Sequence, residues 1–135
     1  MKVSFHLVFA GQCEAAFRFY EKALGGKIET MLTYGASPMA REVSAERRDQ
    51  VVHASMKVGH VVLAGADVAP EEYEKPQGFY ILLNVDDSAE AERVFQALAK
   101  DGDVRMPLQK TFWSPAFGVL VDRFGTPWEI SAAGA

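Results

Sequence analysis

The hydrophobic and polar positions of this chain follow one pattern that runs through the sequence twice. Residues 2–9 alternate, and the positions of one face are all apolar: Val3, Phe5, Leu7 and Phe9. This two-residue period predicts a β-strand with two distinct faces. Residues 11–24 change to helical spacing, and two glycines, Gly25 and Gly26, are expected to end that helix. Residues 27–34 are predicted to form a second strand.

The middle of the chain contains a polar segment, a hairpin and a linker. Residues 35–50 are charged and polar, and we expect a long, mobile loop, a kind of segment that often serves as a lid. Residues 51–58 and 60–66 predict a hairpin that turns at Gly59. Residues 68–77 hold two prolines and several charges, which is typical of a linker.

After the linker the pattern restarts. We expect a strand over 79–85, a helix over 88–100 with Asp87 as its N-cap, and strands over 104–112, 117–122 and 127–132. The order βαβββ is therefore predicted twice, in a module of residues 1–67 and a module of residues 78–135. The expected fold class is α+β, a single domain whose two modules form a mixed eight-stranded curved sheet around a cleft.

Aligning the two halves predicts which residues correspond. The pairs are Phe5 with Phe79, His6 with Tyr80, Gly26 with Gly102, Gly59 with Gly125, and Leu63 with Glu129. Each helix needs one apolar sheet face to pack on, so the opposite face is predicted to line the cleft. The residues expected on that cleft face include His6, His53, Tyr80 and Glu129.

Composition and charge exclude several classes of protein. The chain has 135 residues, 49% of them hydrophobic and 24% charged, which is ordinary for a globular domain. A net charge of -4 without a basic cluster argues against a nucleic-acid partner. No apolar run is long enough to span a membrane, so no membrane partner is expected. The single cysteine, Cys13, cannot form an internal disulfide, which agrees with a cytoplasmic protein.

Five sequence stretches in this double pattern carry a resemblance to a known family. They are EAAFRFYEKALGG at 14–26, HASMKVG at 53–59, VRMPLQ at 104–109, WSPAFG at 113–118 and DRFGTPW at 122–128. The chain resembles the vicinal oxygen chelate superfamily, also called the glyoxalase/bleomycin-resistance/dioxygenase superfamily. It looks most like the PhnB-like branch, often labelled demethylubiquinone methyltransferase-like. The resemblance implies a glyoxalase-like fold and a homodimer, but no single reaction, because the superfamily hosts many.

The resemblance also implies where a metal ion would bind. In metal-dependent members, four cleft positions hold the ion, and the pairing carries them onto His6, Leu63, Tyr80 and Glu129. His6 and Glu129 have the family's ligand types, whereas Leu63 cannot ligate and Tyr80 is a poor substitute for histidine. A catalytic ion normally takes three protein ligands, and His53 would be the third if it faces inward.

Other chemistry is open to the same residues. A carboxylate beside an imidazole suits proton transfer, so His6 and Glu129 are candidates for an acid–base pair or for a structural polar contact. Trp113 and Phe117 lie beside a proline in a loop-like stretch and are candidates for ligand binding. Trp128 is expected in the core, and Cys13, at a helix start, is expected to be buried and inert. No glycine-rich turn between a strand and a helix is present, which argues against a methyltransferase.

The function predicted from these observations is a PhnB-like protein of unassigned activity. It would bind a small, partly apolar molecule in the cleft without a complete metal site, and no cofactor is expected. The predicted ligand-binding residues are Tyr80, Leu63, His53, Trp113 and Phe117. The alternative is a metal-dependent lyase, isomerase or dioxygenase that uses His6 and Glu129, so the sequence leaves open whether the protein is an enzyme.

Overall fold

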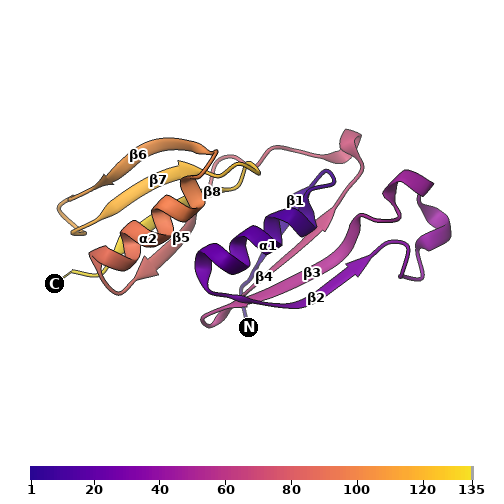
Figure 1. Ribbon diagram of the computed structural model, residues 1–135, viewed down its shortest axis with the longest axis horizontal. Helices are drawn as coiled ribbons and strands as arrows, with labels where there is room; N and C mark the ends of the chain where they lie inside the picture. The colour runs from indigo at the N-terminus through magenta and orange to yellow at the C-terminus, as the bar shows by residue number, and fades with distance from the viewer. Residues whose placement is uncertain (135) are drawn as a thin grey trace. The chain divides into compact units, whose positions relative to one another are not determined.

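The computed structural model describes residues 1–134 and divides the chain into two compact units, Met1–Glu74 and Lys75–Ala135. The division falls inside the segment predicted as a linker, between its residues 68 and 77. Each unit contains one α-helix and four strands in the order βαβββ, and Figure 1 labels these elements. Each unit is described by itself.

The first unit is a four-stranded mixed sheet with one helix. Its elements are β1 (Phe5–Phe9), α1 (Cys13–Leu24), β2 (Lys27–Thr33), β3 (Val51–Val58) and β4 (Val61–Asp67). The strand order is β1-β4-β3-β2, and β1 is parallel to β4 whereas the other neighbours are antiparallel. The chain between β2 and β3 contains two short 3₁₀ helices, Ala40–Glu42 and Ala45–Arg47, where the sequence predicted only a loop.

The second unit repeats this topology. Its elements are β5 (Ile81–Val85), α2 (Ser88–Ala99), β6 (Asp103–Gln109), β7 (Phe117–Val121) and β8 (Pro127–Ala132). The strand order is β5-β8-β7-β6, with β5 parallel to β8. The α+β class is confirmed, and the eight predicted strands form two mixed sheets of four.

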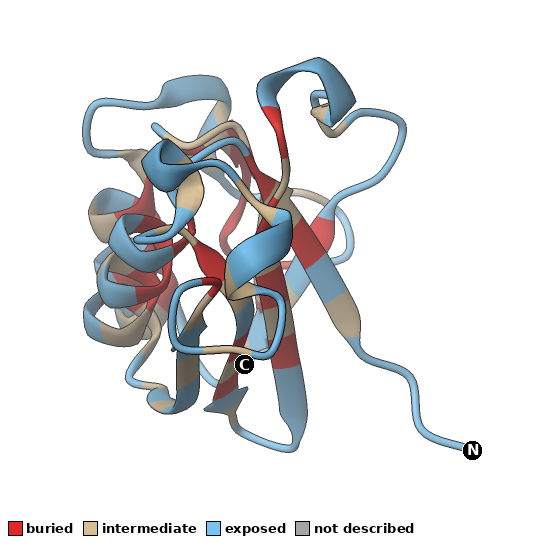
Figure 2. Cartoon of the chain, turned by 90° about the vertical axis from the view of Figure 1, so that its right-hand side faces the viewer, coloured by how far each residue is buried: buried red, intermediate tan, exposed pale blue. Residues whose placement is uncertain are grey.

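The core of the first unit lies between α1 and one face of its sheet. Figure 2 colours the buried residues of the chain red. On α1 they include Ala16, Phe17 and Tyr20, which recur at helical spacing. Phe17 packs directly on the backbone of β4, where a Cβ atom on Gly65 would lie 2.7 Å from the ring. The helix ends at Gly25 in a left-handed conformation (φ 70°) that glycine adopts without strain.

A buried carboxylate holds the start of α1. Asp67, at the end of β4, is 1% exposed. Its Oδ1 accepts hydrogen bonds from the backbone N–H groups of Gly11 (2.8 Å) and Cys13 (3.0 Å), and its Oδ2 accepts from Val51 (2.9 Å). Gln12, the residue at the N-cap position, supplies no side-chain cap. A residue of the last strand therefore caps the helix and also anchors the first residue of β3.

In the second unit, the N-terminus of α2 is capped by a residue that immediately precedes the helix. The Asp87 side chain accepts a hydrogen bond from the Glu90 N–H at 2.8 Å, which confirms the predicted N-cap. The buried face of α2 consists of Ala91, Val94, Phe95 and Leu98. Trp128 is fully buried, as expected, and its indole N–H donates to the buried carboxylate of Asp122 at 2.9 Å.

Neither helix resembles a membrane span. Among residues 1–134, no helix is both long and apolar enough to cross a bilayer.

Candidate functional site

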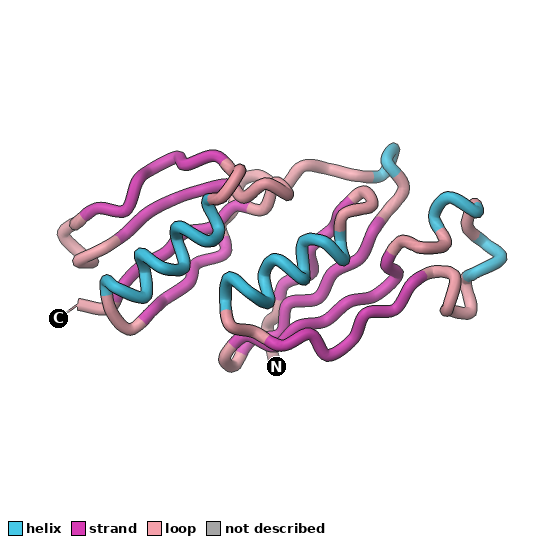
Figure 3. Tube along the Cα trace, in the orientation of Figure 1, coloured by secondary structure: helices cyan, strands magenta, loops and turns pink. Residues whose placement is uncertain are grey.

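Each sheet has one face that its helix covers and one face that no helix of its own unit covers. Figure 3 shows each helix lying along one side of the strands of its unit. We call the uncovered side the open face. In a strand, alternate residues point to opposite faces, so burial and register together assign every strand residue to one side. The open faces are where side chains are available for chemistry.

The parallel ladders identify which residues of the two sheets correspond. The first ladder pairs Phe5 through Phe9 with Leu63 through Asp67, and the second pairs Ile81 through Val85 with Trp128 through Ala132. Superposing the two ladders matches His6 with Leu82, and Ala64 with Glu129. Within the first sheet, His6 lies directly across from Ala64 on the open face. Within the second sheet, Leu82 lies directly across from Glu129 on the open face.

Three pairs expected from the sequence are therefore wrong. Phe5 corresponds to Ile81 instead of Phe79. His6 corresponds to Leu82, two residues beyond Tyr80, and Tyr80 itself precedes β5. The residue corresponding to Glu129 is Ala64 instead of Leu63, and a one-residue shift changes the face. Leu63 is 3% exposed, lies on the helix-covered face and belongs to the core, so the prediction that it lines a cleft is wrong.

The physical reason for the shift is the length of one turn. Four residues, 58–61, separate the paired strand residues Lys57 and Val62, whereas five, 122–126, separate Val121 from Pro127. Aligning Gly59 with Gly125 ignored this extra residue.

The predicted pairing of Gly26 with Gly102 is confirmed. A Cβ atom on Gly26 would lie 2.8 Å from the Lys57 carbonyl, and one on Gly102 would lie 2.6 Å from the Val121 carbonyl. Lys57 and Val121 are themselves corresponding residues of β3 and β7.

The open face of the first sheet is mainly small and polar around His6. Its neighbours across the strands are Ala64 and then Ser55. His53 lies on the same face but in β3, with β4 between it and the strand of His6. Two strand spacings amount to about 10 Å, and two residues along β3 add about 6 Å of offset, so the two histidines are not neighbours.

The open face of the second sheet is more apolar. Glu129 is partly buried and lies between Leu82 on β5 and Val119 on β7. Two residues further along β7, the buried Phe117 pairs with Ser131. A carboxylate flanked by alkyl side chains on both sides is an arrangement that suits an amphipathic ligand.

An aromatic group borders this face. The Trp113 ring lies edge-on to Phe117, with centroids 5.1 Å apart, and edge-on to Phe112 at 4.6 Å. Trp113 and Phe117, predicted together as ligand-binding residues, are thus in contact. Phe112 is 97% exposed, because β6 ends at Gln109 and not at 112 as the sequence suggested.

Neither sheet by itself supplies the donor set of a catalytic metal ion. At the corresponding positions, one donor, His6, lies beside an alanine, and one donor, Glu129, lies beside a leucine. Within residues 1–134, no three His, Cys, Asp or Glu side chains are grouped so that they could hold an ion. A catalytic divalent ion normally needs three protein ligands, which neither sheet supplies.

His6 and Glu129 belong to different units, so the acid–base pair predicted from the sequence stays a prediction. In the first sheet the neighbour of His6 on β4 is Ala64, and in the second sheet the neighbour of Glu129 on β5 is Leu82.

Cys13 is buried at the first residue of α1, as predicted. Burial raises the pKa of its thiol well above the usual range, and the negative charges of Asp67 and Glu14 raise the pKa further. A thiol with a raised pKa is a poor nucleophile at neutral pH. Cys13 is therefore part of the core and not of a reactive site.

The second unit also contains a cavity that the sequence did not predict. Its wall is formed by residues 75–80, by Arg105 of β6, and by Val121 and Pro127 at the turn between β7 and β8. Of these residues, only Tyr80 was a sequence candidate. Lys75 and Arg105 are 30 positions apart and carry no motif, so no sequence signal joined them.

Comparison with known proteins agrees with this architecture. The family model of the Glyoxalase/Bleomycin resistance protein/Dioxygenase superfamily matches residues 3–130. Protein PA1353 from Pseudomonas aeruginosa, known from a crystal structure, is 42% identical with a TM-score of 0.90, and the alignment covers 98% of each chain. YjdN from Escherichia coli (strain K12) is 30% identical over 139 residues, which cover 97% of this chain and 95% of YjdN.

A more distant structure shares the fold. The PhnB protein from Bacillus cereus is 24% identical with a TM-score of 0.84, and the alignment covers 98% of this chain and 100% of that protein. The glyoxalase-like fold predicted from the sequence is confirmed. On the family match and on the full-length similarity to YjdN, the chain belongs to the glyoxalase/bleomycin resistance protein/dioxygenase superfamily.

Proposed function

We propose that this protein is a PhnB-like member of the superfamily that binds a small, partly apolar molecule on the open face of its second sheet, without a complete metal site. The observation that carries the proposal is the setting of Glu129 between Leu82 and Val119. One polar group within an apolar surface orients a ligand, while the alkyl and aromatic surface around it supplies most of the binding free energy.

Two exposed apolar side chains support the same proposal. Leu82 and Trp113 are 47% and 52% exposed, although both are large and apolar. Apolar side chains gathered on one surface often mark a binding site, and a bound ligand would remove them from water.

A ligand screen tests this proposal directly. Purified protein would be heated with a panel of small aromatic and aliphatic compounds, because a ligand that binds only the folded state raises Tm. Compounds that stabilise the wild type would be retested on Leu82→Lys and on Glu129→Gln. We expect both substitutions to reduce the Tm shift, because they change the apolar wall and the polar anchor.

The matched control is Glu92→Gln on α2, an exposed carboxylate on the helix-covered side of the same unit. It should leave every Tm shift unchanged. The proposal fails if no compound stabilises the protein, or if Leu82→Lys and Glu92→Gln act alike on all of them.

Metal analysis separates this function from the metal-dependent alternative. If protein purified without chelators carries a stoichiometric divalent ion that is lost in both His6→Ala and Glu129→Ala, the chain is a metal-dependent lyase, isomerase or dioxygenase. Our proposal expects no such ion and no rise of Tm when zinc, nickel or manganese is added.

We further propose a homodimer located in the cytoplasm. The dimer is suggested by the family, and the location by a single cysteine that is buried and unpaired. Sedimentation equilibrium would test the dimer, and fractionation of cells that express the tagged chain would test the location.

A further inference from the structure

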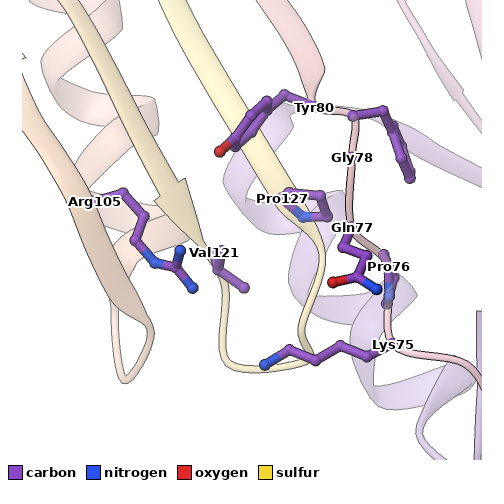
Figure 4. Close-up of a pocket in the computed structure, with 9 residues that line it drawn as sticks. Lys75, Pro76, Gln77, Gly78, Tyr80, Arg105, Val121 and Pro127 are labelled. Carbon is purple, nitrogen blue, oxygen red and sulfur yellow. The ribbon is translucent and has the colours of Figure 1, made fainter.

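The cavity of the second unit is large enough for an organic molecule. Its volume is about 190 Å³, whereas about 10–15 Å³ measured in the same way holds one water molecule. Figure 4 shows that Arg105 reaches into it from the β6 side, and that Lys75 and Gln77 extend from the opposite wall. Tyr80 closes one end, with its ring turned towards the strands.

The charge of the lining is of one sign. Lys75 and Arg105 are cationic, Gln77 and Tyr80 offer N–H and O–H donors, and no carboxylate belongs to the lining. Lys75 has no ion-pair partner within the described part of the chain. A small cavity with two cations and two neutral donors attracts an anionic group.

One neighbouring carboxylate holds Arg105 in place. The Nε atom of Arg105 donates to Asp103 Oδ2 at 2.6 Å. This contact uses one edge of the guanidinium, so the terminal N–H groups stay available for a second anion. Asp103 offsets one of the two positive charges, which leaves the site a net charge of about +1 and favours a singly charged group over a highly charged one.

The remaining wall is apolar and leads onto the open face. Val121 and Pro127 are paired neighbours at the ends of β7 and β8, and Glu129 is two residues beyond Pro127. Two residues of a strand span about 6–7 Å. A ligand with its anionic group in the cavity would therefore extend its apolar part towards Leu82 and Glu129, and a second negative charge at that end would be repelled.

We infer that this cavity binds the carboxylate or phosphate group of a small organic anion whose apolar part rests on the open face of the second sheet. The inference rests on the proposed function and adds the chemical class of the ligand. Because the cationic side chains are exposed, each contributes modestly and is screened by salt, so binding is expected in the micromolar to millimolar range.

Titration by NMR tests the site with defined probes. Uniformly ¹⁵N-labelled protein would be titrated with benzoate, phenyl phosphate and the neutral benzyl alcohol. We expect benzoate or phenyl phosphate to shift the backbone amides of Gln77, Tyr80 and Arg105, and to bind about tenfold more tightly than benzyl alcohol. The ratio of the two anion affinities decides whether a carboxylate or a phosphate is preferred.

Charge-neutral variants locate the interaction. Lys75→Gln and Arg105→Gln should each raise the Kd of the bound anion about three- to tenfold, and Arg105→Lys should recover part of the loss because it restores the charge but not the planar fork. The matched controls are Lys100→Gln and Arg93→Gln, two exposed cations of the same unit that lie outside the lining. Far-ultraviolet circular dichroism confirms that each variant is folded.

Three results would overturn the inference, and the third leaves the proposed function standing. One is an anion Kd that is the same in wild type, Lys75→Gln and Arg105→Gln, and the second is no saturable shift at the cavity up to about 50 mM probe. In the third, benzyl alcohol and benzoate bind equally and shift only residues around Leu82 and Glu129, so the anion site is wrong while the proposed function stands.

Discussion

The carboxylate of Asp67 should dominate the stability of the first unit. Replacing it with alanine leaves three backbone N–H donors without their acceptor, two of them in fully buried hydrogen bonds. Each orphaned buried donor costs about 1–3 kcal/mol, so Asp67→Ala should lower the free energy of unfolding by about 4–5 kcal/mol. That is a large share of the roughly 5–15 kcal/mol available to a typical protein.

Urea unfolding followed by circular dichroism measures this loss. Both tryptophans, Trp113 and Trp128, lie in the second unit, so their fluorescence reports that unit separately. Asp67→Asn keeps the size and one acceptor oxygen, and about half of the loss is expected for it. Asp86→Ala, an exposed aspartate, is the control and should change stability by less than about 0.5 kcal/mol.

Hydrogen exchange shows whether the loss of the three hydrogen bonds to Asp67 causes the lower stability. The amides of Gly11, Cys13 and Val51 should lose protection in Asp67→Ala before the rest of their elements. The reasoning is refuted if Asp67→Ala is as stable as Asp86→Ala, or if these three amides keep their wild-type protection.

Three further predictions concern other buried positions. Burial raises the pKa of Cys13, so its thiol stays protonated in the folded state at a pH where the unfolded chain has lost the proton. The folded state therefore keeps its full stability below the unfolded pKa of about 8.5. Above that pH, the free energy of unfolding falls by up to about 1.4 kcal/mol per pH unit. The difference in unfolding free energy between wild type and Cys13→Ala, measured across alkaline pH, should show this slope, and a difference independent of pH would contradict it. Gly65→Ala should cost about 1–3 kcal/mol because its Cβ would lie 2.7 Å from a buried aromatic ring, whereas Gly134→Ala, which meets nothing within 4 Å, should be neutral in the same urea titration. Trp128→Phe should cost about 3 kcal/mol, since it removes buried surface and leaves Asp122 Oδ2 without its indole donor; a Tm equal to that of the wild type would show that this hydrogen bond contributes nothing.

Most of the secondary structure could be predicted because its signals are local. The strand over 127–132 is found with the predicted bounds, and the helix predicted over 88–100 is Ser88–Ala99. Periodic apolar positions and the Asp87 cap lie within the element they define. The start of α1 was placed two residues too early, because the carboxylate that caps it comes from Asp67, which is 54 residues from Cys13 in the chain.

The candidate site was predictable only in part. The alternation of β1 and β8 correctly placed His6 and Glu129 on open faces, because face is a property of a single strand. The partner of each residue depends on register, and one extra residue in the turn after β7 was enough to misplace Leu63. The cavity depends on where residues 75–80 run relative to the ends of β6 and β8, and no local pattern encodes that path.

The origin of the two helix caps decides when each helix can close its first turn during synthesis. α2 carries its cap three residues away, so its first turn can close as soon as Glu90 has been added. α1 must wait until Asp67 has left the ribosome, and the same residue then fixes the beginning of β3. The first unit therefore stays incomplete until nearly its whole length is available, and its exposed helix stripe is the part of the nascent chain that most needs protection from aggregation.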